Sequence, residues 1–203
     1  MASLVLSGDS SGSITVSAPS VAGSTTQTLV NVTGTLAPIV SGTAVTCAGQ
    51  TSIDFTGIPS WVKRITVMFQ GVSLSGTSNF LIQAGVGSTP ATTGYNSSAV
   101  SVSVSVASTT SGSGSNTTNG FTAAGWASTA ASTASGQFVL TNISGNIWVG
   151  SGVIYAIGNL RIATFAGDLS LGGTLGMIRV TTVNGTDTFD TTPSAGTINI
   201  IYE

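Results

Sequence analysis

The stretch Val100-Ser-Val-Ser-Val-Ser-Val106 decides the class of fold. Four valines alternate with three serines, and a period of two residues is the repeat of a β-strand, whose successive side chains point to opposite faces. The pattern therefore predicts a strand that packs its valines against a core and directs its serines toward water or a neighbour.

Further strand-like segments lie on both sides of this stretch. They are rich in β-branched and aromatic residues and are bounded by Gly, Pro and Asn. Asn184-Gly185 follows one of them, where this dipeptide favours a tight hairpin turn. The predicted strands lie near 43–47, 51–57, 62–72, 78–86, 98–107, 136–143, 146–157, 159–166, 169–174, 176–183 and 196–202.

The remaining segments do not show a helical period, so we expect an all-β fold. Thr109–Asn119 is rich in Ser, Gly, Thr and Asn and is predicted to be an exposed loop. Ala123–Ser135 is also interpreted as a loop. About ten short strands in one domain are typical of an antiparallel β-sandwich or a jelly-roll-like domain.

Residues 1–37 differ from the rest of the chain. Their apolar pieces, at 4–6, 14–16 and 28–30, are strand-like but too short to bury much area by themselves. We therefore expect a short β-rich N-terminal attachment arm over 1–37, followed by the β-sandwich domain over 38–203. The apolar side chains predicted to attach this arm to a larger particle are Leu4, Val5, Ile14, Val16 and Leu29.

The composition removes most catalytic chemistry. The 203 residues include no histidine, one cysteine, four basic and six acidic side chains, with a formal net charge of −2. Histidine-based triads and imidazole metal sites are therefore impossible, and we expect no cofactor and no resident metal. A nucleic-acid partner would require a basic stripe, so we expect no nucleic-acid partner. Cys47 is expected to be buried and unpaired.

The apolar runs argue against a membrane protein. None approaches the roughly 18 residues of a membrane span, so we expect no membrane insertion. The first residues lack the basic leader and the apolar length of a secretory signal. We expect the chain to be made in a cytoplasm.

Few charged residues could form a site. Asp187 and Asp190 are the closest pair of carboxylates in the sequence and follow the Asn-Gly turn. Capping of turn backbone is the simplest interpretation, with a weak calcium site and a hydrolytic pair as alternatives. Arg179 is expected to pair with an acid such as Asp54.

The aromatic residues divide into two groups. Tyr95 and Trp126 fall outside the predicted strands, so they are the candidates for exposed contact residues, since Trp and Tyr provide flat platforms for sugars and rigid contacts at interfaces. Trp148 and Tyr155 lie within predicted strands and are expected in the core.

Three parts of the chain resemble structural proteins of tailed bacteriophages, of the short tail-fibre or head-fibre type. The first is Gly8–Gly23, followed by Gln27–Leu29 and Thr33–Leu36. The second is Ile53–Phe69, which contains Ile-Pro-Ser-Trp-Val-Lys-Arg. The third is Ile178–Asp190, followed by Gly196–Ile200. Residues 87–135 carry none of the resemblance.

The resemblance implies a virion protein that forms a homotrimer, is anchored by its N-terminal arm and faces outward with a β-rich domain. The leading hypothesis is a non-enzymatic, fibre-like protein that binds other virion proteins and a host surface glycan. The alternatives are a capsid decoration protein that clamps the head and, third, a glycan-degrading enzyme that uses two aspartates.

Overall fold

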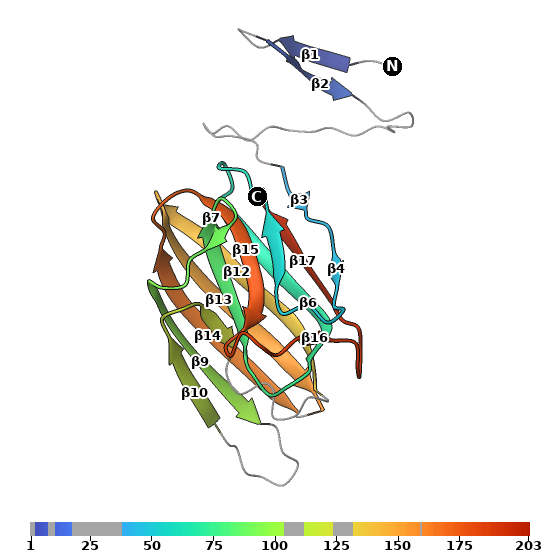
Figure 1. The fold of residues 1–203 in the computed structure, drawn as a ribbon. Helices are drawn as coiled ribbons and strands as arrows, with labels where there is room; N and C mark the ends of the chain where they lie inside the picture. Colours follow the sequence, from blue (N-terminus) through green and yellow to red (C-terminus); the bar gives the residue numbers. More distant parts are fainter. Residues whose placement is uncertain (1–2, 8–10, 18–37, 104–111, 124–131, 159) are drawn as a thin grey trace. The chain divides into compact units, whose positions relative to one another are not determined.

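The computed structural model describes residues 3–7, 11–17, 38–103, 112–123, 132–158 and 160–203 (Figure 1). The chain divides into two compact units, Met1–Leu36 and Ala37–Glu203. The sequence placed this boundary one residue later, after residue 37.

The described residues of the smaller unit form an antiparallel hairpin. Strand β1 (Ser3–Ser7) pairs with β2 (Ser13–Ser17), with Leu4 opposite Val16 and Leu6 opposite Ile14. The third strand-like piece predicted for this unit, at 28–30, lies outside the described residues.

The larger unit is built on one long antiparallel sheet, which Figure 1 shows behind a shorter one. Its centre is the meander β12 (Thr133–Ser144), β13 (Ile147–Ile157) and β14 (Arg161–Ser170). On one side β14 pairs with β9 (Tyr95–Ser103), and β9 with β10 (Gly112–Thr117). On the other side follow β6 (Arg64–Leu74), β17 (Thr197–Tyr202) and β3 (Val40–Ser41), with β4 (Val45–Thr46) beside β17 and β16 (Phe189–Asp190) beside β6.

The shorter sheet is also antiparallel. Its order is β11 (Phe121–Ala123), β7 (Phe80–Val86), β15 (Leu175–Thr182) and β5 (Ile53–Thr56), and β8 (Thr89–Pro90) adds to β7. The described residues contain no helix, and hence none that could cross a membrane. The prediction of an all-β antiparallel sandwich is confirmed.

Large and small side chains alternate across the inner face of the long sheet. One row of paired residues runs Phe138, Gly152, Phe165 and Ala99 from β12 to β9. The rings of Phe138 and Phe165 stack with centroids 5.5 Å apart. A Cβ atom on Gly152 would lie 2.7 Å from Cζ of Phe165. Because Gly152 has no side chain, the ring of Phe165 has room at this position.

Three of the sequence interpretations of elements are wrong in whole or in part. The loop predicted over 109–119 contains β10, because its small polar residues pair with the edge of β9. The separate strand predicted at 169–174 does not form; its first two residues end β14. In the predicted loop at 123–135, β12 begins at Thr133, while 124–131 lie outside the described residues.

The predicted burial of Cys47 and Trp148 is confirmed: Cys47 is fully buried and Trp148 is 4% exposed. Burial raises the pKa of the Cys47 thiol to about 11.

Candidate interaction surface

Strand β9 faces the opposite way from the sequence prediction. Val100 and Val102 are 46% and 41% exposed, whereas Ser101 is fully buried. Val104 and Val106 lie outside the described residues. The prediction that the valines pack against the core is therefore wrong for the two valines that are described.

The neighbours of β9 explain this inversion. Ala99 stands opposite Phe165, whose ring occupies the inner layer. Strand β11 also lies against β9. Small inward side chains leave space for both, so the alanine and serines point inward and the valines outward. This arrangement leaves the hydroxyls of Ser97 and Ser101 buried with no hydrogen-bond partner among the described residues.

Strand β13 carries apolar side chains on both faces. Trp148, Ile154 and Ala156 are buried. Tyr155, predicted to be in the core, is 38% exposed. The apolar residues that share its parity in the strand are exposed as well. The prediction for Tyr155 is wrong because Trp148, Ile154 and Ala156, which have the opposite parity in β13, occupy its inward positions.

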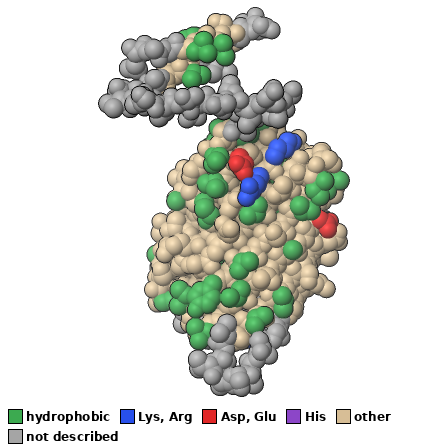
Figure 2. Space-filling view, turned by 180° about the vertical axis from the view of Figure 1, so that it is seen from behind, with side chains coloured by type: hydrophobic (Ala, Val, Ile, Leu, Met, Phe, Trp, Pro, Cys, Tyr) green, Lys and Arg blue, Asp and Glu red, His purple; other side chains and the backbone are tan. Residues whose placement is uncertain are grey.

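These exposed side chains form one continuous cluster on the outer face of the long sheet. Cross-strand pairing aligns Tyr155 with Ile162 and Ile162 with Val102, while Thr164 stands between Val153 and Val100. Figure 2 shows apolar side chains gathered at the lower left of this face. We call the cluster the outer apolar patch; it consists of Val100, Val102, Val153, Tyr155, Ile157 and Ile162.

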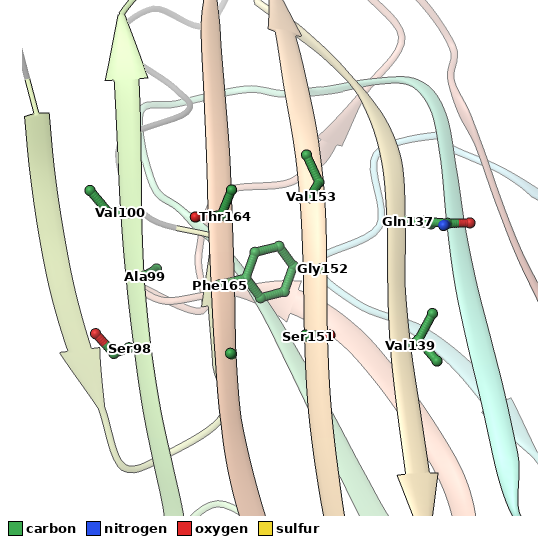
Figure 3. Close-up of a pocket in the computed structure, with 11 residues that line it drawn as sticks. Ser98, Ala99, Val100, Gln137, Val139, Ser151, Gly152, Val153, Thr164 and Phe165 are labelled. Carbon is green, nitrogen blue, oxygen red and sulfur yellow. The ribbon is translucent and has the colours of Figure 1, made fainter. Parts of the chain in front are cut away.

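A shallow hollow of about 520 Å³ adjoins the patch (Figure 3). It exists because small side chains, those of Ser98, Ser151 and Ala166, occupy outward positions between larger ones. The ring of Phe165 is visible beside Gly152 at its floor. The residues that line the hollow include no ionisable side chain.

The charged groups of the sandwich lie elsewhere. On the outer face, Asp168 accepts a hydrogen bond of 3.0 Å from Asn96, beyond the Ser98–Ala166 row. On the shorter sheet, Arg179 donates two hydrogen bonds of 2.7 Å to Asp54, which confirms the predicted pairing. The hydrogen bonds to Asp54 raise the pKa of Arg179 above its usual value.

The aspartates of the Asn-Gly turn are engaged with backbone and amide donors. Asp187 accepts hydrogen bonds from the Ser78 backbone N–H at 2.9 Å and from the Asn184 amide at 2.8 Å. Asp190 accepts from the backbone N–H groups of the two residues that follow it. Both carboxylates thus act as turn caps, and the described residues hold no cluster of three potential metal ligands.

Of the two predicted contact residues, Tyr95 is buried. It is 1% exposed, and its hydroxyl both donates to the Ala84 carbonyl at 3.1 Å and accepts from the Ala84 N–H at 2.9 Å. Burial raises the pKa of this phenol. The exposed contact role predicted for Tyr95 is therefore wrong. Trp126 lies outside the described residues.

The residues predicted for attachment belong to the β1–β2 hairpin. Leu4, Val5 and Val16 are 53–60% exposed, and Leu6, between them, is 55% exposed. Ile14 pairs with Leu6 through the backbone. Leu29 lies outside the described residues. The hairpin thus carries exposed apolar side chains at consecutive positions, and therefore on both of its faces.

The outer apolar patch was missed at the level of sequence, although a signal for it exists. Segment 146–157 has large apolar residues at adjacent positions, as in Val153-Ile-Tyr155. A strand with apolar residues at both parities needs cover on both faces.

Comparison of the chain with protein-family models, with curated proteins and with solved structures finds no match.

Proposed function

We propose that this chain is a non-enzymatic surface protein of a tailed-bacteriophage virion, fibre-like, attached by its N-terminal unit and presenting the sandwich for host adhesion. The sequence resemblance motivates the proposal. The observation that supports it best is the β1–β2 hairpin, which leaves Leu4, Val5, Leu6 and Val16 more than half exposed.

An exposed apolar hairpin of this size needs a partner. Two strands of five residues are marginally stable in water, and burial of apolar side chains provides most of the free energy of docking. A hairpin that docks into another virion protein would gain both its order and its affinity from that contact. The sandwich, which has its own core, then remains available for host contact.

Localisation on particles tests the proposal. Purified virions of the phage that encodes the chain are labelled with gold-conjugated antibody raised against the sandwich. We expect label on the tail or on projecting fibres, and we expect the purified protein to compete with virions for adsorption to host cells. Unlabelled particles would contradict the virion assignment.

The hairpin provides a matched pair of variants. Leu6→Asp places a charge on an exposed apolar position, and Ser7→Asp places the same charge on the adjacent exposed serine. We expect Leu6→Asp to be depleted from purified virions at least about tenfold by immunoblot, and Ser7→Asp to be incorporated like the wild type. Equal incorporation of both variants would contradict attachment through the hairpin.

A capsid decoration protein is the second candidate, because a broad sheet face with few charged side chains suits close contact with a shell of repeated subunits. Antibody label distributed over the whole head, with no competition for adsorption, would favour decoration over adhesion.

A further inference from the structure

The outer apolar patch is a contiguous feature of one face of the molecule. Single exposed apolar residues are ordinary on protein surfaces, whereas contiguous patches mark places of contact. Here the six side chains come from three adjacent strands, β9, β14 and β13, and their rows are aligned by the register of the sheet.

The exposed area of the patch matches what a stable association needs. Its members are 38–53% exposed, and the patch is of the size, several hundred Å², at which contiguous apolar surface marks an interaction site. A standard interface buries about 800 Å² per partner, of which roughly 60% is apolar. The patch therefore provides a large part of the apolar share of one side of such an interface.

The surroundings of the patch define the chemistry of its partner. Neutral polar side chains, Ser98, Gln137, Ser151 and Thr164, lie beside it, and no ionisable group lines the adjoining hollow. A charged partner would lose hydration over the hollow without gaining an ion pair from its lining. Only 5% of this chain's residues are charged, so a second copy offers a surface of the required neutrality.

The face carries both projecting side chains and a hollow. Val153 and Tyr155 project from it, and the hollow formed over Ser98, Ser151 and Ala166 lies on the same face, one row further along the strands. In a symmetric interface each surface element of one copy meets the matching element of the other. Projecting side chains of one copy can therefore fill the hollow of its partner.

We propose that the outer face of β9, β14 and β13 binds the same face of a second copy of this chain, so that the outer apolar patch is buried between sandwiches. This inference does not depend on the proposed virion function, because it concerns association of the purified chain in solution.

Sedimentation velocity of the full-length protein over a range of concentrations tests the inference. We expect a dimer that dissociates on dilution, since an interface formed by the same face of both copies closes with two chains. Ser151→Lys adds a charge to the hollow without removing an apolar side chain, and Val153→Thr with Ile162→Thr removes apolar surface while keeping the β-branch that suits a strand. Each should raise the dissociation constant about tenfold or more.

The control is Val183→Thr, which alters a valine of similar exposure, 41%, outside the patch and beyond the end of β15. It should associate like the wild type, and all variants should keep the wild-type circular dichroism spectrum. A wild-type chain that remains monomeric at its highest soluble concentration would overturn the inference. So would an assembly that both patch variants leave intact while Leu6→Asp in the hairpin dissolves it.

Discussion

At the scale of the residue, buried serines behave in two different ways in this sandwich. Ser101 and Ser73 are both fully buried. The Ser73 hydroxyl lies 3.2–3.4 Å from the backbone carbonyl oxygens of Asp190, Thr192 and Ser194. The Ser101 hydroxyl has no such partner among the described residues. A buried hydroxyl without a partner lowers stability, whereas a bonded one contributes to it.

Alanine substitution should separate the two serines. We expect Ser73→Ala to lower the free energy of unfolding by about 1–2 kcal/mol, because it leaves backbone carbonyls without their donor. We expect Ser101→Ala to leave stability unchanged or to raise it by up to about 1 kcal/mol, because it removes an unsatisfied hydroxyl. Urea denaturation of both variants measures the difference. Equal losses would mean that Ser101 has a partner in the folded protein.

At the scale of the element, β9 shows which properties of a strand can be predicted from sequence and which cannot. Ten of the fifteen strands described in the larger unit were located from β-branched and aromatic residues, because these pack well on a pleated surface; β3, β8, β10, β11 and β16 were not. Alternation defines two faces of a strand but not which face is inward. For β9 the answer depends on Phe165 and on β11, which contact it from distant parts of the sequence.

Other elements escaped prediction for related reasons. The residues of β10 have low strand propensity and form a strand only through pairing with β9. Tyr95 was predicted to be exposed because it falls outside the predicted strands; its hydroxyl instead satisfies the backbone of Ala84. The Asp54–Arg179 pair could be predicted because few charged residues were available as partners.

Gly152, on the inner face of β13, makes room for the aromatic layer. A Cβ on Gly152 would approach Cζ of Phe165 at 2.7 Å and the carbonyl oxygen of Gln137 at 2.8 Å. We expect Gly152→Ala to lower the free energy of unfolding by about 1–3 kcal/mol, as overpacked core positions do. Ser151→Ala, at the next and outward-facing position, should change it by no more than about 0.5 kcal/mol. Urea denaturation checks both, and equal effects would show that the ring of Phe165 moves aside freely.

At the scale of the whole molecule, the sandwich has a core of its own. The buried cluster extends from Cys47 to Ile200 and includes no residue of the N-terminal unit among those described. Stability of the sandwich should therefore be independent of the first 37 residues.

Deletion of residues 1–37 tests this independence. We expect the shortened protein to unfold within about 2 °C of the full chain, since a change of 1 kcal/mol moves the Tm of such a domain by roughly 2–4 °C. Differential scanning calorimetry provides the measurement. A much lower Tm would place residues 1–37 within the cooperative fold instead of in an appended unit.

The apolar residues on both faces of β13 also affect the order of events during folding. Strands β12, β13 and β14 follow one another with short connections, so their hairpins can close early, whereas β9 must return to β14 from about sixty residues away. Until β9 arrives, the meander exposes Phe138 and Phe165 on one side and Val153 and Tyr155 on the other. Such a half-built sheet is prone to aggregate, so the yield of folded protein should fall when many chains are synthesised at once, and slower synthesis should restore it.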